Sequence, residues 1–375
     1  MDVVYVTHDS LSEGIGMSQI IPVLSGLSKA GFLVGVISCE KRNPPSQLTQ
    51  MLSEQNILWK PIKFGRNGAI GGVGRIVRIA LNLPAAKVYH CRGDISATAT
   101  SLRTRKPFLW DVRGLWLDQK IIQSNIQKRH LVIFFAKQLE KRASSKASAV
   151  STLTTAVYPI LRSRHPKMTS NHRVIPTCTD LNKFKYSPSL PTENILLLSG
   201  VFNNYYDLEV TKQFIQKCKE SFNVEVVWCH GVEAERSELG VGETTVKVLS
   251  QSEMPNEIAN STFGLAICKE NVGESLFGVM PTKVAEFLAT GRPVVVSRGI
   301  GDLDSMLSEF NAGIVLNSER LDDSVTALEK LLQDPSTPLR CRELAEKYFS
   351  MELAVDKYSA VLKDLIDSNL APNEQ

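Results

Sequence analysis

Residues 281–297, PTKVAEFLATGRPVVVS, decide how this chain is to be interpreted. The proline at the start suits the first position of a helix, and Gly291 suits its end. The apolar run that follows is typical of a buried strand. Lys283 and Glu286 lie three residues apart, on one face of the expected helix. Because free N–H groups at a helix start can hold an anion, the stretch predicts a phosphate site. An ordinary β-α-β unit ended by glycine is the plainer alternative.

The length and the cysteines limit the class of protein. A chain of 375 residues is too long for one ordinary core, so we expect two domains. The seven cysteines form no Cys-x-x-Cys pair and no metal-ligand spacing, which is typical of reduced thiols in a cytosolic protein. The N-terminus shows no secretory pattern, and no window approaches the ~18 apolar residues of a membrane span. We therefore expect a cytoplasmic protein, soluble or peripheral to a membrane.

The net charge of +4 conceals opposite charges in the two halves. Residues 1–190 hold 27 Lys and Arg against 10 Asp and Glu, a net charge of +17, whereas residues 191–375 carry −13. A basic half attracts nucleic acids, anionic lipids or acidic small molecules. No RRM, KH or zinc-finger pattern is visible, so we expect no nucleic acid among the partners.

Short apolar runs alternate with longer helical patterns along the chain, which predicts parallel sheets covered by helices on both faces. The first set of strands is expected at 3–6, 32–38, 87–90, 107–111, 149–152 and 173–176. The pattern restarts after a polar stretch, with strands at 195–200, 225–229, 245–249, 263–267, 293–296 and 313–316. The fold class is α/β, with two Rossmann-like, doubly wound parallel-sheet domains, 1–186 and 187–350. The carboxyl ends of both sheets would face a central crevice, where ligands bind in such folds.

The stretch 281–297 resembles the P-T-K-x-x-E signature of family-four glycosyltransferases, which have the GT-B fold. The resemblance implies an enzyme that moves a sugar from a nucleotide diphosphate sugar, with a UDP-sugar expected first, to a glycan or lipid-linked acceptor. It also implies retention of anomeric configuration. An acceptor on a lipid-phosphate carrier, as in surface polysaccharide biosynthesis at the inner face of the membrane, would in addition suit the basic half of the chain. In this family the lysine, here Lys283, faces the donor diphosphate beside Thr282, and the glutamate, here Glu286, holds the ribose. Residues 351–375 would form the helix that crosses back to the first domain.

The loop after the first strand is HDSLSEGIGMSQ, residues 8–19. It resembles the family's S-x-x-x-G-x-G-x-S-Q loop, which closes over the donor. Gly14 and Gly16 would let the backbone approach that ligand closely. Gln19 occupies the place of the third glycine of G-x-G-x-x-G, and we expect no acidic residue after the second strand, so a nicotinamide enzyme is disfavoured. A flexible β–α turn is the alternative.

Residues 111–116, DVRGLW, follow a buried strand, so Asp111 and Arg113 should lie at its carboxyl end, where charges need a partner or a ligand. The stretch resembles a D-[VI]-R-G-x-W motif of one branch of the family, which implies catalytic roles for both residues. A buried Asp111–Arg113 pair with a structural role explains it equally well. His90 and Arg92 end the preceding strand in the same way and are secondary candidates.

Two departures from the family pattern concern the donor. The family's glutamate eight residues before the ribose glutamate is here Gly278, and Glu274 nearby is our candidate in its place. Residues 200–207 lack the Arg and Lys that many members carry for the phosphates. These departures leave a catalytically degenerate binding subunit of a glycan assembly complex as one alternative. A sugar-nucleotide 2-epimerase on the same fold is another.

Neither a metal nor another cofactor is expected. The only candidate Asp-x-Asp, residues 302–304, stands at an expected helix start, where acidic residues favour the helix dipole. Residues 120–146 place basic residues around the apolar run 131–136. This pattern is typical either of an amphipathic helix on anionic lipid or of a sheet-covering helix with a solvated basic face. We therefore expect an anionic acceptor, an anionic membrane surface, or both, as partners of the basic half.

Overall fold

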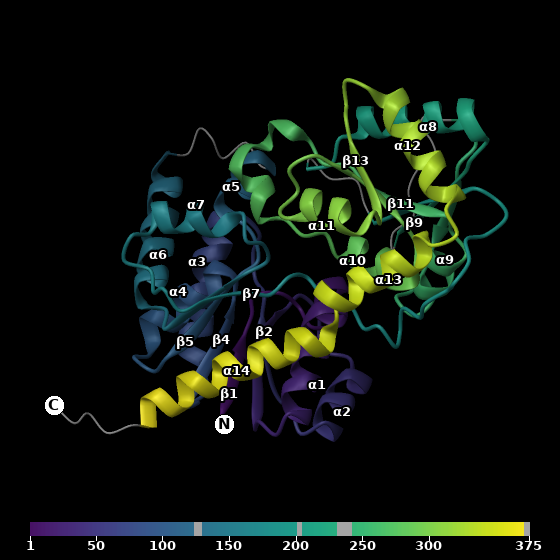
Figure 1. The fold of residues 1–375 in the computed structure, drawn as a ribbon. Helices are drawn as coiled ribbons and strands as arrows, with labels where there is room; N and C mark the ends of the chain where they lie inside the picture. The colour runs from purple at the N-terminus through teal and green to yellow at the C-terminus, as the bar shows by residue number, and fades with distance from the viewer. Residues whose placement is uncertain (124–129, 201–204, 231–241, 371–375) are drawn as a thin grey trace. The chain divides into compact units, whose positions relative to one another are not determined.

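A computed structural model describes the chain except for residues 124–129, 201–204, 231–241 and 371–375 (Figure 1). The chain divides into two compact units. Unit 1 comprises Met1–Ile175 together with Met351–Gln375, and unit 2 comprises Pro176–Ser350. Each unit contains one parallel sheet covered by helices, as the alternating pattern predicted.

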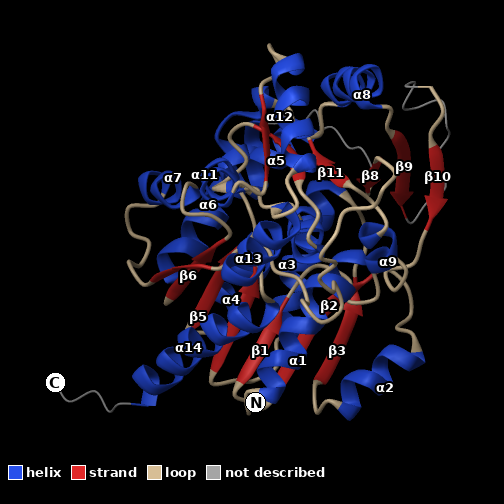
Figure 2. Cartoon of the chain, turned by 45° about the vertical axis from the view of Figure 1, so that its right-hand side comes forward, coloured by secondary structure: helices blue, strands red, loops and turns tan. Residues whose placement is uncertain are grey.

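The sheet of unit 1 has seven parallel strands in the order β3-β2-β1-β4-β5-β6-β7. Figure 2 labels β1, β2, β3, β5 and β6 of this sheet. The strands are β1 Val3–Val6, β2 Val34–Glu40, β3 Leu58–Lys63, β4 Val88–Arg92, β5 Phe108–Val112, β6 Ala149–Thr152 and β7 His172–Val174. The strands β1, β2, β4, β5 and β6 are buried along their whole length, as expected for a parallel sheet with covered faces. The edge strand β3 is largely exposed and contains Pro61, so its sequence, LWKPIK, did not predict a strand.

Helices cover both faces of this sheet. They are α1 Ile21–Lys29, α2 Ser46–Glu54, α3 Gly68–Asn82, α4 Gly93–Arg103, α5 Trp116–Gln123, α6 His130–Lys146, α7 Val157–Arg164 and α14 Met351–Leu370, with a π-helical turn, η1, at Gly16–Ile20. The helices α3, α4 and α6 pack side by side and share one core with the strands. α14, the yellow helix of Figure 1, packs on α1, where a Cβ on Gly26 would come within 2.3 Å of the Val355 side chain.

The sheet of unit 2 has six parallel strands in the order β10-β9-β8-β11-β12-β13. The strands are β8 Ile195–Ser199, β9 Glu225–His230, β10 Thr245–Val248, β11 Phe263–Ala266, β12 Val294–Ser297 and β13 Gly313–Leu316. The helices are α8 Leu208–Phe222, α9 Met254–Ala259, α10 Thr282–Thr290, α11 Leu303–Phe310, α12 Leu321–Gln333 and α13 Thr337–Tyr348, with a 3₁₀ segment, η4, at Glu270–Gly278. In both sheets the strand order reverses beside the first strand, at β1/β4 and at β8/β11, and ligands bind at such switch points.

The division between the units falls at Ile175/Pro176, whereas the sequence placed it at 186/187. Residues 176–186 bond within unit 2: the Thr177 hydroxyl donates to the Met280 carbonyl (2.8 Å), and the Thr179 N–H donates to the Phe349 carbonyl (2.8 Å). The guanidinium of Arg342 donates to carbonyls of the same segment. The backbone bonds of this segment thus assign it to unit 2, and the polar stretch at 187–194 lies inside that unit.

Candidate functional site

The switch point of unit 2 is built around Gly200, which directly follows β8. The N–H of Gly200 donates to the Cys229 carbonyl (2.8 Å), and its own carbonyl accepts from Nε1 of Trp228 (2.8 Å). Its φ of +90° lies in the left-handed region that favours glycine. The chain therefore turns sharply here in a fixed position. Residues 201–204, which belong to the segment without Arg and Lys, lie outside the described residues.

Lys283 lies beside this turn. Its Nζ stands 4.4 Å from the ring centroid of Tyr206, and a Cβ on Gly200 would lie 3.8 Å from that Nζ. Lys283, Gly200, Tyr206 and Thr211 line a small pocket together with apolar residues of β8 and β11. Pro281 is the N-cap of α10, one position earlier than the sequence suggested, and the helix begins at Thr282. The pocket thus has a cation and a helix N-terminus at its edge, an arrangement suited to an anion.

The rest of the 281–297 stretch holds α10 in place. Phe287 packs so closely against β11 that a Cβ on Gly264 would come within 2.4 Å of its ring. Gly291 ends the helix at φ +84°, as predicted. Arg292 is buried and donates to the side chain of Ser187 (2.9 Å) and to the Ala259 carbonyl (2.6 Å). These contacts hold the C-terminal half of α10 against the sheet, and the first turn of the same helix carries Lys283.

Glu286 lies on the same helix as Lys283, and its side chain is half-buried. Burial raises its pKa to about 7, although Lys183 and Lys283 act in the opposite direction. Its pKa therefore lies near neutral pH, where a bound hydrogen-bond donor could tip it to the ionised form. Glu274, the other predicted carboxylate, is exposed in η4, next to the kink at Gly273. Ser275 beside it shares a hydrogen bond with the hydroxyl of Tyr205 (2.7 Å).

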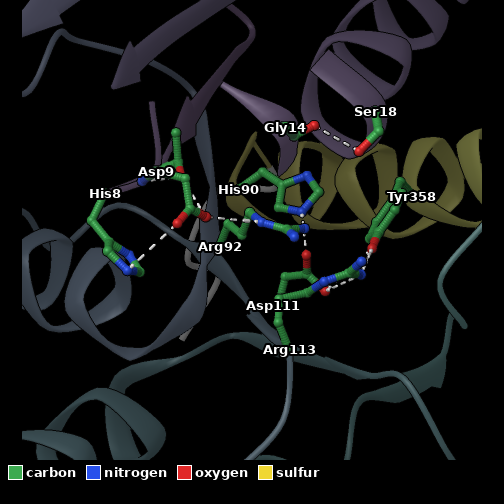
Figure 3. A network of polar contacts seen from close by, with 10 residues as sticks. His8, Asp9, Gly14, Ser18, His90, Arg92, Asp111, Arg113 and Tyr358 are labelled. Carbon is green, nitrogen blue, oxygen red and sulfur yellow. Dashed lines mark hydrogen bonds and ion pairs between the residues drawn. The ribbon is translucent and has the colours of Figure 1, made fainter. Parts of the chain in front are cut away.

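In unit 1 the structure buries Asp111 at the carboxyl end of β5 (Figure 3). Its Oδ1 accepts hydrogen bonds from Ser151 Oγ (2.9 Å) and from the Tyr358 hydroxyl (3.2 Å). Nη1 of Arg113 lies 3.7 Å from the same oxygen, and Nε2 of His90 lies 3.4 Å from Oδ2. Burial would raise the pKa of Asp111, but Arg113 and His90 outweigh it and hold that pKa well below its usual range. Asp111 is an ionised carboxylate enclosed by protein groups.

These partners tie the end of β5 to α14. Arg113 donates to the Tyr358 hydroxyl (3.3 Å), and the His90 ring lies between the rings of Tyr5 (4.4 Å) and Tyr358 (4.6 Å). Burial lowers the pKa of His90 and favours its neutral form. This geometry favours the structural reading of the Asp111–Arg113 pair. Arg113, with a side chain 15 % exposed, is the member that retains some access to solvent.

His8 and Asp9, for which the sequence pattern predicted no role, follow β1 at the switch point of unit 1. Asp9 Oδ2 lies 3.3 Å from Nε of Arg92 at the end of β4, and Nε2 of His8 lies 3.7 Å from Asp9 Oδ1 (Figure 3). Burial would raise the pKa of Asp9, but His8 and Arg92 lower it. Burial lowers the pKa of His8, whose imidazole is therefore neutral at pH 7. The two polar residues directly after the first strand could have predicted this cluster, because ligands bind at the carboxyl ends of strands in such sheets.

A correction concerns the end of β2, where we expected no acidic residue. Glu40 is the last residue of that strand and is buried. Its carboxylate accepts from the hydroxyls of Ser10 (2.5 Å), Ser12 (2.9 Å) and Ser38 (2.6 Å) and from the Leu11 N–H (2.9 Å). These bonds lie within the protein, so Glu40 holds the loop after β1 where a dinucleotide-binding acid would hold a ribose. An acidic residue is thus present at the end of β2, but its oxygens already accept hydrogen bonds from the protein, which still argues against a nicotinamide enzyme.

The two glycines of that loop differ. A Cβ on Gly16 would come within 2.2–2.5 Å of backbone atoms of Ser10 and Leu11, so the absence of a side chain is required by packing within the loop. A Cβ on Gly14 would meet nothing within 4 Å, and Gly14 is exposed. The carbonyl of Gly14 accepts from the Ser18 hydroxyl (2.8 Å), one turn into the following helix (Figure 3). Gly14 is therefore the glycine of the two that leaves room for a ligand.

Asp304, in the Asp-x-Asp at 302–304, bonds to the backbone at the start of α11. Both carboxylate oxygens of Asp304 accept from the Gly299 N–H (3.1 Å each) at the start of α11. Within the described part of the chain, no group of three or more His, Cys, Asp and Glu side chains is placed to hold a metal ion. No described helix is both long and apolar enough to cross a membrane.

No protein-family model matches this sequence, and no curated protein matches it. Solved structures do. Sucrose-phosphate synthase from Thermosynechococcus elongatus has a TM-score of 0.76 at 14% identity, over 98% of this chain and 100% of that chain. HepE from Anabaena, in complex with UDP, has a TM-score of 0.70 at 11% identity, over 97% and 100%. WaaG, a glycosyltransferase involved in lipopolysaccharide biosynthesis, has a TM-score of 0.65 at 13% identity, over 96% and 99%. Together with the two parallel sheets, these likenesses establish that the chain has the two-domain GT-B fold.

Proposed function

We propose that this chain is a glycosyltransferase that moves a sugar from a nucleotide diphosphate sugar, UDP-sugars first, to a glycan or lipid-linked acceptor. The observation that carries the proposal is the position of Lys283. Its ammonium group stands at the start of α10, beside Gly200 at the switch point of the second sheet. Among proteins of this fold, HepE was solved with UDP and with UDP-glucose, and WaaG is a glycosyltransferase. Both facts support a diphosphate as the ligand of this pocket.

In this proposal the donor lies with its diphosphate at the N-terminus of α10. Lys283 and the N–H groups of the first turn, with the Thr282 hydroxyl, bind the phosphate oxygens. Glu286, one turn further along, accepts hydrogen bonds from the ribose hydroxyls once it is ionised. From unit 1 we propose the loop with Gly14 and Gly16 as the second donor-binding segment.

Transfer breaks the bond between the anomeric carbon and the diphosphate oxygen and forms a bond from that carbon to the acceptor oxygen. The acceptor proton leaves with the departing diphosphate or with water. Negative charge grows on the leaving oxygen, so fixed cations there lower the barrier. We propose Lys283 and Arg113 as these cations, Glu274 as a contact to the sugar, and Asp111 as the group that positions Arg113. We further propose retention of configuration without a metal ion.

The acceptor proposal rests on charge. With its two segments together, unit 1 carries +13 and unit 2 carries −9. On α6, Phe134 and Phe135 are 56% and 63% exposed, and Lys137, Lys141 and Lys146 are exposed as well. Lys128 and Arg129, which the sequence pattern included, lie outside the described residues. We propose that unit 1 takes an anionic acceptor of surface polysaccharide assembly at the inner face of a membrane, and that α6 contributes to the contact with lipid.

The test is donor turnover by the purified chain. A thermal-shift screen of nucleotides and nucleotide sugars identifies the base, because a ligand at 100 times its dissociation constant stabilises by about 2.7 kcal/mol. Candidate donors are then incubated with and without lipid-linked acceptors. Sugar transfer to an acceptor supports the proposal, whereas release of an epimerised sugar without acceptor would assign the chain as a 2-epimerase. Nucleotide binding without turnover of any donor would leave a binding subunit.

A further inference from the structure

Four large aliphatic side chains of α3 face solvent in a single row. Ile70 is 80% exposed, Val73 57%, Val77 49% and Leu81 75%. Their spacing of three, four and four residues places them on one face of the helix, over about 16 Å of its length at ~1.5 Å per residue. We refer to these four residues as the α3 stripe. Isolated exposed aliphatic side chains are common, but a continuous row along one helix marks an interaction surface.

The opposite face of α3 is already occupied. Ile76 and Ile79 are buried in the core of unit 1, where α3 packs on α4. Two faces of the helix are thus apolar, with Arg75 and Arg78 on the side between them, whereas a surface helix normally has one apolar face. The sheet requires only the Ile76 and Ile79 face. Packing within unit 1 therefore does not account for the α3 stripe.

The segment that contains the stripe carries charges of one sign. Residues 55–93 contain no Asp or Glu, and they contain seven Lys and Arg. Arg75 and Arg78 turn toward the loop before α3, where they donate to the carbonyls of Arg66 (2.9 Å) and Phe64 (2.8 Å). The side chains of Lys60, Lys63 and Arg66 are exposed, and Lys60 donates to the Asn82 carbonyl (2.8 Å) at the end of α3. Cations therefore flank the stripe at both ends.

We propose that the α3 stripe is a docking surface for an anionic lipid bilayer. The aliphatic row would enter the boundary between headgroups and acyl chains, while Lys60, Lys63 and Arg66 contact lipid phosphates. A second copy of this chain is a poorer occupant, since a symmetric dimer through this face would oppose two patches of the same positive charge. The chemistry of the surface thus favours lipid.

The stripe lies on another helix than Phe134 and Phe135 of α6, and its test needs no sugar donor or acceptor. The variant is Ile70→Gln/Leu81→Gln, which changes the two most exposed members of the stripe and leaves the charge unchanged. The matched control is Val248→Gln/Leu339→Gln, two aliphatic residues of unit 2 that are 55% and 49% exposed. Each protein is sedimented with vesicles of phosphatidylcholine alone and of phosphatidylcholine with phosphatidylglycerol, at low and high salt. Melting curves verify that all three proteins are folded.

The wild type and the control should bind the anionic vesicles, less at high salt, and neutral vesicles weakly. The α3 variant should bind the anionic vesicles at least about tenfold less. The proposal is overturned if the folded variant binds anionic vesicles as well as the wild type does, or if the wild type does not bind them. It is also overturned if the variant changes only the oligomeric state, because the stripe would then be covered by a second copy. A parallel Phe134→Gln/Phe135→Gln variant measures the contribution of α6 independently.

Discussion

Replacement of Glu286 by glutamine should stabilise the ligand-free protein above neutral pH while weakening nucleotide binding. Burial raises the pKa of Glu286 from 4.5 to about 7. Between these values the folded state keeps the proton and the unfolded state loses it. The stability that the protonated group contributes is therefore complete below about pH 4.5 and is lost as the pH rises to about 7.

The size of the effect follows from this shift. At ~1.4 kcal/mol per pKa unit, ionising Glu286 in the fold costs up to about 3 kcal/mol above pH 7 and less than about 1 kcal/mol at pH 5. Glutamine has nearly the same shape and no charge, so Glu286→Gln removes this cost. For a unit of this size, about 3 kcal/mol corresponds to roughly 6–12 °C in Tm. The variant should therefore melt well above the wild type at pH 8 and close to it at pH 5.

Two measurements check the reasoning. Melting curves of the wild type, Glu286→Gln and the exposed control Glu319→Gln are recorded at both pH values without ligand. Calorimetric titration with UDP at pH 8 should then show affinity reduced about 10- to 100-fold in Glu286→Gln, because a charged acceptor for the ribose is lost. Parallel pH dependence in wild type and variant would refute the raised pKa of Glu286. Unchanged UDP affinity would refute its role toward the ribose.

Lys283→Ala should lower turnover about 10²- to 10³-fold, while the lost contact with the Tyr206 ring should cost at most about 1 kcal/mol of stability. Steady-state kinetics are compared with those of the exposed control Lys330→Ala, and equal turnover of the two variants would contradict the role of Lys283. Turnover should persist in EDTA, and its loss with recovery on adding Mn²⁺ or Mg²⁺ would establish a metal requirement. Glu40→Gln removes one carboxylate oxygen and leaves hydrogen-bond donors of the loop after β1 without an acceptor. The variant should therefore lose about 2 kcal/mol or more of stability and bind the nucleotide sugar more weakly. An unchanged Tm would mean that this carboxylate does not hold the loop.

Sequence patterns predicted the fold class and most strands because buried parallel strands are continuous apolar runs. The strand β12 and the glycine end of α10 lie where residues 291–297 placed them. The strand β3 was missed because an exposed edge strand needs no apolar run, and Pro61 contradicts the usual signal. The unit boundary was misplaced because it was judged from the composition of residues 187–194. The hydrogen bonds from Arg342 to the carbonyls of Leu181 and Phe184, which join the preceding segment to unit 2, leave no mark on composition.

Some features of the candidate site could likewise be predicted from the sequence, and others could not. The neighbourhood of Lys283 and Glu286 could be predicted, since a helix places both on one face. The enclosure of Asp111 could not, because its donor Tyr358 comes from the far end of the chain. The bonds of Glu40 to Ser10 and Ser12 likewise join residues about thirty positions apart, and they form only after β1 and β2 have paired. Contacts of this kind depend on the folded sheet.

The position of α14 has a consequence for the order in which the chain matures during synthesis. Unit 2 is complete once Ser350 has been translated, but unit 1 still lacks Val355 and Tyr358 at that point. The surface of α1 around Gly26 and the carboxylate of Asp111 therefore lack their partners until the last segment is made, so the first domain cannot complete its packing before synthesis ends. A premature stop codon or a protease cut after Ser350 would accordingly damage the domain at the beginning of the chain.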